Sequence, residues 1–223
     1  MNLAIITHAD DNVKQMKGIS HPLIEQYADK CNADYINMTH KCDVPHAYRI
    51  LKLSQYLEQY DRILNLDSDI IINKDCPNIF DHVPQDHIGT IYEDVGTRQG
   101  DRRQRIHKSQ QKFGEIGWKT GYINTGVLLV SKIHQNIFQP INGELWMNLG
   151  YDDVHLGYNI NKNKHLIHEL EYKWNHMSMF SEPWNGNADR FKSHIIHYAG
   201  KGLFDKGNRI EQMKFDKDKI YVR

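Results

Sequence analysis

Residues 62–72 read RILNLDSDIII, and this run sets two acidic side chains, Asp67 and Asp69, among largely apolar neighbours. A buried charge without a partner is costly, so the run predicts a core strand that ends where the acids begin. Residues i and i+2 of an extended chain point to the same side, and the two carboxylates can therefore converge on one point. In open α/β sheets, ligands collect outside the carboxyl ends of the strands. The stretch thus indicates a ligand site at the edge of a sheet.

A divalent metal ion would give these two acids a shared partner. Two close carboxylates repel each other, and the repulsion raises one pKa unless a cation neutralises them. Mn²⁺ and Mg²⁺ prefer carboxylate oxygen ligands, so a D-x-D triplet suits either ion. The triplet also fits an ordinary strand end or turn. An EF-hand is disfavoured, because Ile71 stands where a loop ligand is needed.

Apolar spacing along the rest of the chain predicts alternating strands and helices. Residues 3–7 are typical of a buried strand. Residues 21–32 place apolar side chains on one helical face, with Pro22 suited to the first turn. The other predicted elements are a short strand at 33–38, a helix at 47–60, strands at 61–66, 69–72, 87–92 and 122–131, and late strands within 165–174 and 193–200. This alternation predicts the α/β class, with a central mixed, mostly parallel sheet flanked by helices.

Length, charge and cysteine content limit the classes of function. The chain has 223 residues, with 28 Lys plus Arg and 28 Asp plus Glu, so its formal charge is zero. That balance gives no footprint for nucleic acid or for an anionic membrane. Three scattered cysteines form no disulfide framework or zinc finger, and we expect thiols in a reducing compartment. Without signal-peptide features or a run of ~18 apolar residues, we expect one cytoplasmic domain and no membrane span.

One segment, residues 93–121, breaks the alternation. It is polar, rich in Arg, Lys and Gln, and lies between two predicted strands. A long connection of this kind is either functional or merely mobile. It suits a solvated insertion with some helix, or a basic lid over an anionic ligand, and the sequence leaves both open.

Seven stretches carry a recognisable pattern in a fixed order. In chain order they are LAIITHADD (3–11), YADKCNADY (27–35), YDRILNLDSDIIINKD (60–75), YINTGVLLVS (122–131), YDDVHL (151–156), YKWN (172–175) and HIIHYAGKG (194–202). Together they resemble the motifs of GT-A-fold glycosyltransferases, especially glycosyltransferase family 8 and its relatives. The resemblance implies a single GT-A-type (Rossmann-like) domain over residues 1–223. Its nucleotide-binding part would be about 1–92 and its acceptor-side part about 93–223.

The resemblance also implies a metal site formed by Asp67, Asp69 and His197. An imidazole beside two carboxylates suits Mn²⁺ more than Mg²⁺. His194, three residues earlier, should face the other side of its strand. The residues that would contact the donor nucleotide are Thr7, His8, Ala9, Lys52, Asp67, Ser68, Asp69, Gly200 and Lys201. Relatives commonly read Lys-Pro-Trp after the histidine and glycine, whereas this chain reads GKGLFDKG, so Lys206 competes with Lys201 for the diphosphate.

Three residues are candidates for contact with the donor sugar. The D-Q pair of relatives is Asp152-Asp153 here, and the resemblance implies a place beside the sugar, where Asp153 would stabilise an oxocarbenium-like state or attack it. The two acids also suit a helix start, with Asp152 as the N-cap and Asp153 in the first turn. Asn124 is unusual in a strand, and a local bulge with Gly126 would explain it, whereas the resemblance implies recognition of a sugar hydroxyl.

The implied activity is metal-dependent transfer of a hexose from a nucleotide-sugar, UDP-sugar by analogy, to a glycan or other hydroxyl acceptor, with retention. A bound metal would neutralise charge on the leaving diphosphate as a Lewis acid. Two rival classes stay open. A metal-dependent phosphoesterase or nucleotidyltransferase would release phosphate or pyrophosphate without sugar transfer, and a silent module would bind sugar nucleotides without turning them over. The donor sugar, the acceptor and the oligomeric state are not determined by the sequence.

Overall fold

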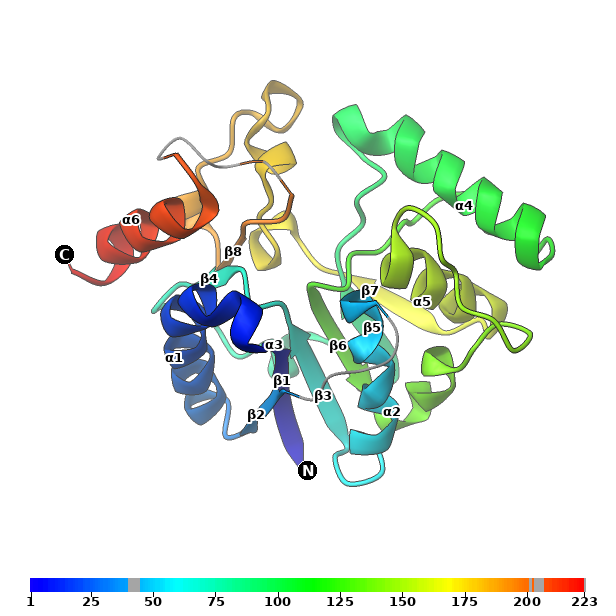
Figure 1. Cartoon of the computed structure of the whole chain (residues 1–223), viewed down its shortest axis with the longest axis horizontal. Coiled ribbons are helices and arrows are strands. Elements are labelled where there is room, and N and C mark those ends of the chain that lie inside the picture. The colour runs from blue at the N-terminus through cyan, green and yellow to red at the C-terminus, as the bar shows by residue number, and fades with distance from the viewer. Residues whose placement is uncertain (40–44, 201, 203–206, 223) are drawn as a thin grey trace.

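The computed structural model describes residues 1–39, 45–200, 202 and 207–222, and a six-stranded sheet runs through the middle of this part of the chain (Figure 1). From one edge to the other its strands are β2 (Asp34–Met38), β1 (Leu3–His8), β3 (Arg62–Leu66), β6 (Val127–Ser131), β5 (His87–Thr90) and β7 (Leu166–Glu169). β6 is antiparallel to both neighbours, and the other pairs are parallel. A second sheet pairs β4 (Ile70–Ile72) with β8 (Ile195–His197). The predicted mixed, mostly parallel sheet is confirmed.

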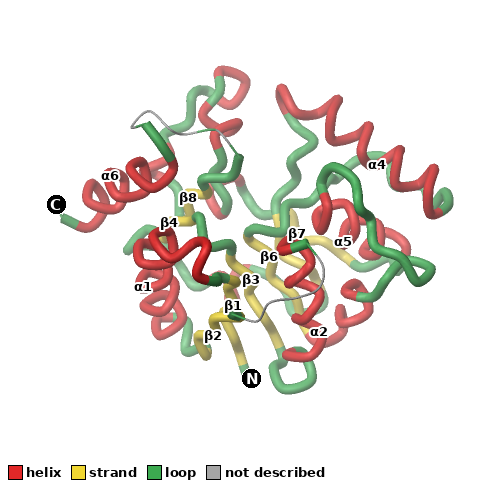
Figure 2. Tube along the Cα trace, viewed as in Figure 1, coloured by secondary structure: helices red, strands yellow, loops and turns green. Residues whose placement is uncertain are grey.

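Helices surround the sheet (Figure 2). The α-helices are α1 (Lys14–Lys30), α2 (Leu53–Tyr56), α3 (Ile79–His82), α4 (Gln99–Phe113), α5 (Tyr151–Lys162) and α6 (Arg209–Tyr221). The 3₁₀ helices are η1 (Asp11–Val13), η2 (His46–Lys52), η3 (Gly96–Arg98), η4 (Lys132–Phe138), η5 (Tyr172–Trp174), η6 (Ser178–Ser181), η7 (Pro183–Asn185) and η8 (Arg190–Lys192). None of the described helices combines the length and apolar composition needed to cross a bilayer.

The alternation of side chains along β3 explains why both faces of the sheet are covered. Successive strand residues point to opposite faces. Leu64 packs in one core cluster with Ile24 of α1, whereas Ile63 packs in another with Leu53 of α2 and Leu156 of α5. All five residues of β3 are buried, as expected for a central strand with apolar layers on both sides.

Strand direction gathers the segments of interest at one edge. β1 and β3 are parallel, so their carboxyl ends, His8 and Leu66, lie together. β6 is antiparallel to β3, and Val127 at its amino end pairs with Leu66. Residues that follow β3 and residues that precede β6 therefore meet. Because β6 lies between β3 and β5, the sheet contains strands from both of the predicted parts, 1–92 and 93–223.

Several predicted element bounds are wrong. α1 begins at Lys14 rather than near 21, and Pro22 lies inside it, because Ile19 and the partly buried Met16 belong to an apolar cluster with Ile71 of β4 and Ile196 of β8. The predicted strand 122–131 is shorter, since β6 begins at Val127. The predicted helix 47–60 is η2 followed by the short α2, and the strand predicted within 165–174 is β7 followed by η5.

Candidate active site

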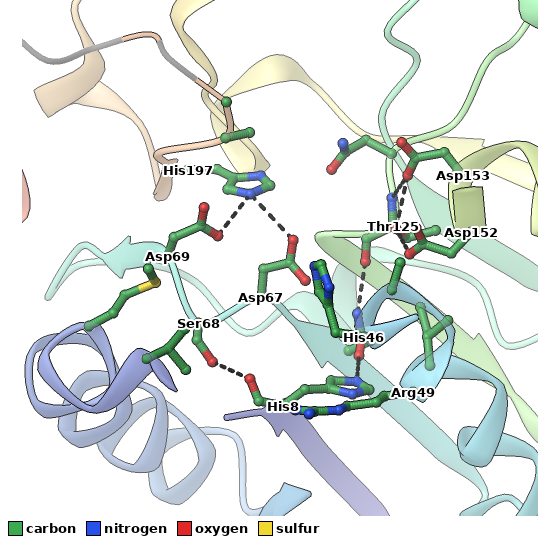
Figure 3. A pocket seen from close by; sticks show the side chains of 18 of the residues that line it. His8, His46, Arg49, Asp67, Ser68, Asp69, Thr125, Asp152, Asp153 and His197 are labelled. Atoms are coloured by element: carbon green, nitrogen blue, oxygen red, sulfur yellow. Dashed lines mark hydrogen bonds and ion pairs between the residues drawn. The ribbon is translucent and has the colours of Figure 1, made fainter. Parts of the chain in front are cut away.

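A cavity of about 520 Å³ opens at the carboxyl ends of β1 and β3 (Figure 3). This size suits a small organic ligand. Segments far apart in the sequence build it, and its described lining is His8, Asp10, Asn12, Val13, Met16, His46, Ala47, Arg49, Ile50, Asn65, Asp67, Ser68, Asp69, Asn124, Thr125, Asp152, Asp153, His197, Ala199, Gly200 and Arg209.

The three predicted metal ligands meet in this cavity. Their ligand atoms all lie within 4.8 Å of one another. His197 directs Nε2 at both acids, 3.4 Å from Oδ2 of Asp67 and 3.2 Å from Oδ1 of Asp69 (Figure 3). The antiparallel register of β4 and β8 causes this approach, because His197 pairs with Ile70, directly after the D-x-D triplet. Sheet pairing thus brings together residues about 130 positions apart.

The charges in this cluster support one another. Burial alone would lower the pKa of His197, but Asp69 and Asp67 raise it to about 10. Burial would likewise raise the pKa of Asp69, yet the nearby His197 and Arg209 lower it. Arg209, at the start of α6, places Nη1 3.0 Å from Oδ2 of Asp69. Two carboxyl groups beside one imidazole nitrogen form a donor set that fits a divalent cation of the Mn²⁺ type.

Gly126 packs directly against two of the predicted ligands, Asp67 and His197. A Cβ at this position would lie 2.4 Å from Cε1 of His197 and 2.9 Å from Oδ2 of Asp67. The Gly126 carbonyl also accepts the backbone N–H of Asp67 at 2.9 Å. Close packing against Asp67 and His197 therefore requires the glycine of the N-x-G motif. This packing is further evidence that the two side chains are held close together.

Asp152 and Asp153 lie in the same cavity, in the first turn of α5. The N-cap prediction for Asp152 is wrong, because Gly150 is the N-cap and has a left-handed φ of 86°. The hydroxyl of Thr125 contacts Oδ2 of Asp152 at 2.7 Å and Oδ1 of Asp153 at 2.9 Å. One hydroxyl hydrogen cannot serve two carboxylates, so this contact pattern suits a pair that shares one proton.

The pKa values of Asp152 and Asp153 are shifted in the opposite direction to that of Asp69. Burial raises the pKa of Asp152 to about 7, against the opposing hydrogen bond from Thr125. Burial and the neighbouring Asp152 raise the pKa of Asp153 well above its usual range. Asp153 also accepts the backbone N–H of Thr125 at 2.9 Å. Burial and mutual repulsion thus favour a pair that holds a proton near neutral pH.

Asn124 precedes β6 rather than interrupting a strand, and its amide group is already engaged. Its Oδ1 accepts the backbone N–H of Gly126 at 3.0 Å and Nδ2 of Asn175 at 2.7 Å. Its Nδ2 donates to Oε1 of Glu93 at 2.7 Å. Asn124 lines the cavity but is 7% exposed, so its main contacts are with the protein.

The predicted nucleotide-binding residues divide into two groups. His8, Asp67, Ser68, Asp69 and Gly200 line the cavity. Thr7 and Ala9 are fully buried and are not among the described lining residues, and the hydroxyl of Thr7 lies 3.2 Å from that of Ser68. Lys52 is not among the described lining residues, and Arg49 of the same η2 is. Lys201 and Lys206 lie outside the described residues.

Sequence reasoning missed several cavity residues. Arg49 bonds to Oδ2 of Asp10 at 2.6 Å, which sets a paired cation and acid at the rim. Thr125, the middle residue of the N-x-G motif, joins the two acids of α5. Arg209 follows the segment 203–206 and reaches Asp69. The motif neighbourhoods ADDN (9–12) and NTG (124–126) were visible in the sequence, but no local pattern identifies Arg209, because its contact depends on where α6 begins.

The segment 93–121 is largely the helix α4, and the described cavity lining contains no residue from it. Its apolar side chains are buried or partly buried, with Ile106 1% and Trp118 2% exposed. Its arginines are paired with acids of the chain: Nε of Arg102 lies 2.6 Å from Glu93 and Nε of Arg103 lies 3.0 Å from Asp94. These contacts favour an ordered, internally neutralised segment over a basic lid.

Comparisons with known proteins agree with this geometry. The family model described as glycosyl transferase family 8 matches residues 7–202. Similar solved structures include a glycosyltransferase involved in glycosylation of the major capsid of PBCV-1, with a TM-score of 0.63 and 15% identity over 97% of this chain and 99% of that one. Another is the galactosyltransferase LgtC with donor and acceptor sugar analogs, with a TM-score of 0.59 and 16% identity over 98% and 96%.

Mouse xyloside xylosyltransferase 1 is also similar, with a TM-score of 0.53 and 11% identity over 89% of this chain and 98% of that one. At these identities the structural likeness shows the fold alone, which is the predicted GT-A type. A search of proteins with curated functions found no sequence match.

Proposed function

Because the chain belongs to glycosyl transferase family 8 and is a glycosyltransferase, we propose that it moves a hexose from a UDP-sugar to a hydroxyl group of a glycan or glycoconjugate, with a divalent metal and with retention. The observation that carries the proposal is the convergence of Asp67, Asp69 and His197 in one cavity. The galactosyltransferase LgtC, which has this fold, was solved with donor and acceptor sugar analogs. That likeness supports the hexosyl and nucleotide-sugar parts of the proposal.

The chemistry divides between the two sides of the cavity. Asp67, Asp69 and His197 would hold the divalent cation, which when bound neutralises charge on the leaving diphosphate as a Lewis acid. Arg209, beside Asp69, adds a fixed positive charge near that group. On the other side, Asp152 and Asp153 would face the sugar, where a carboxylate stabilises the positive charge that develops.

A thermal-shift panel tests the proposal. The protein is heated with UDP, UDP-hexoses and other nucleoside diphosphate sugars, each with Mn²⁺, with Mg²⁺ and with EDTA. A ligand at ~100-fold excess over its Kd should add roughly 2.7 kcal/mol to the free energy of unfolding. We expect the largest shift with a UDP-sugar and Mn²⁺, and none with EDTA.

Product analysis separates the proposal from its rivals. A glycosyltransferase releases UDP and free or transferred sugar from the stabilising donor. Release of phosphate or pyrophosphate instead would indicate a phosphoesterase or nucleotidyltransferase, and binding without turnover would indicate a silent module. Full activity in EDTA would overturn the metal dependence.

A further inference from the structure

A chain of buried polar side chains leads away from the metal cluster. Nδ1 of His197, the nitrogen opposite the acids, lies 2.8 Å from Oδ1 of Asn175. Nδ2 of Asn175 donates to Oδ1 of Asn124 at 2.7 Å, and Nδ2 of Asn124 donates to Oε1 of Glu93 at 2.7 Å. Oε2 of Glu93 accepts Nε of Arg102, on α4, at 2.6 Å. This series of hydrogen bonds thus runs from His197 on β8, through the side-chain amides of Asn175 and Asn124, to the ion pair of Glu93 and Arg102.

The backbone N–H of Gly126 fixes the orientation of the two asparagine amides and therefore the direction of their hydrogen bonds. The N–H of Gly126 can only donate, and it donates to Oδ1 of Asn124 at 3.0 Å. The amide nitrogen of Asn124 therefore faces Glu93, and its oxygen faces Asn175. Asn175 must then use its nitrogen toward Asn124 and its oxygen toward His197. Because Oδ1 of Asn175 can only accept a hydrogen bond, Nδ1 of His197 must carry a proton.

Burial makes this arrangement costly to reverse. Asn175 is 0% exposed, His197 and Glu93 are each 2% exposed, and water cannot replace a lost partner without a rearrangement. Nε2 faces the two acids (Figure 3), and with one proton held on Nδ1 it is Nε2 that would give up its proton and present a lone pair when a cation binds. Partners that bond the second nitrogen of a metal-binding histidine fix its tautomer and its ring orientation.

We propose that Asn175 is a positioning residue of the metal site, which holds the proton of His197 on Nδ1 and presents Nε2 to the cation. Glu93 and Arg102 form the far end of this series of hydrogen bonds. Through them, α4 supports His197 on the side of the imidazole that faces away from the two acids. The inference rests on the proposed function, because it takes the cluster to bind a divalent metal.

Mn²⁺ binding to the full chain, without nucleotide, tests this role independently of turnover. Asn175→Ala removes the acceptor for Nδ1–H, and we expect Mn²⁺ affinity by calorimetry to fall about 10- to 100-fold. Pulsed EPR of the bound Mn²⁺ should lose or weaken the nitrogen coupling from a coordinated imidazole. Asn175→Asp keeps an acceptor for Nδ1–H but loses the donor to Asn124, so affinity should stay within about threefold of the parent.

A matched variant separates positioning from general loss of a buried amide. Asn159 is 4% exposed on α5, and its Nδ2 donates to the carbonyls of Ile137 and Gln139 at 2.8 Å each. Asn159→Ala should lower the melting temperature and leave Mn²⁺ affinity and the EPR nitrogen coupling unchanged. Circular dichroism confirms that each variant is folded before binding is measured.

The outcomes distinguish this inference from the proposed function. If the parent protein does not bind Mn²⁺, the metal part of the proposed function fails. If the parent binds and folded Asn175→Ala binds equally well with the same nitrogen coupling, the positioning role alone is overturned. Equal loss of affinity in Asn175→Ala and Asn159→Ala would also overturn it, because the effect would then follow from stability.

Discussion

The two acidic groups of the cavity are alike in composition and opposite in electrostatic character. Asp67 and Asp69 lie on one side in Figure 3, and Asp152 and Asp153 lie on the other. His197 and Arg209 lower the pKa of Asp69 against the effect of burial, whereas burial raises the pKa of Asp152 to about 7. The first pair is poised to hold a cation, and the second to share one proton. Environment, not residue type, assigns the two jobs.

The largest expected effect comes from removing one acid of the metal cluster. Asp69→Asn deletes a charge that His197 and Arg209 both contact, so it should weaken Mn²⁺-dependent UDP binding and lower turnover about 10³-fold. Calorimetry and donor-hydrolysis rates measure the two quantities. Asp75→Asn, an exposed acid after β4, is the control and should behave like the parent. Parent-like UDP–Mn²⁺ affinity in Asp69→Asn would mean that Asp69 is not a ligand.

The acid pair should show a division of labour between its members. Asp152→Asn removes one of the two carboxyl groups that would face the sugar, and we expect turnover to fall about 10²- to 10³-fold with UDP–Mn²⁺ affinity nearly unchanged. Burial and Asp152 raise the pKa of Asp153 well above its usual range, so Asp153→Asn should cost only about tenfold. Rates and calorimetry on both variants provide the comparison. A larger loss of turnover in Asp153→Asn than in Asp152→Asn would reverse this ranking.

The close packing of Gly126 offers a way to disturb the metal side without removing a ligand. Gly126→Ala would place a Cβ 2.4 Å from Cε1 of His197, so the imidazole must shift, and Mn²⁺ affinity should fall about 10-fold or more. Gly18→Ala is the matched control, because a Cβ there meets nothing within 4 Å. Calorimetry compares Mn²⁺ binding by the two variants, and equal affinity would show that position 126 tolerates a side chain.

The smallest expected effect is a pH dependence of stability from the acid pair. The pKa of Asp152 is raised to about 7 in the folded protein from 3.8, so between about pH 4 and 7 the folded state binds more protons than the unfolded state. Stability from this group is therefore lost as pH rises through that range. Asp152→Asn lacks this loss, and its melting temperature should gain a few degrees relative to the parent at pH 8 compared with pH 5. A difference that does not change with pH would count against the raised pKa.

The sequence was informative where local chemistry and fold agree. The apolar run before Asp67 forms the central strand β3, and the N-x-G glycine lies at the cluster for a steric reason. Predictions failed where tertiary packing changed a local preference. Pro22 favours a first turn, yet α1 extends back to Lys14, and Ile19 joins an apolar cluster with Ile71 and Ile196. Of Thr7, His8 and Ala9, only His8 is among the described cavity lining, and nucleotide contacts of the other two stay predictions.

Asn175 illustrates the limit of motif reasoning. The stretch YKWN marked its position, but nothing in four residues indicates that its amide would bond the imidazole of His197. Arg102 was predicted only as part of a basic segment, and the fold pairs it with Glu93 inside the protein. A hydrogen-bond partner far away in sequence is chosen by strand register and helix docking, which no local pattern specifies.

By itself, the sequence determined the inventory and the order of the parts: a buried strand that ends in two acids, an N-x-G turn before a second apolar strand, two further acids, and a late histidine. The strands follow from the apolar period, because apolar runs must be buried and adjacent strand residues must alternate. The N-x-G turn, the two further acids and the late histidine were identified by resemblance to the family. The tertiary structure alone decided which charges meet. Antiparallel pairing of β4 with β8 sets His197 against Asp69, and packing of α5 sets Asp152 and Asp153 against Thr125. Since a pKa depends on burial and on neighbours within a few ångströms, chemically identical carboxyl groups acquired opposite shifts only when the chain folded.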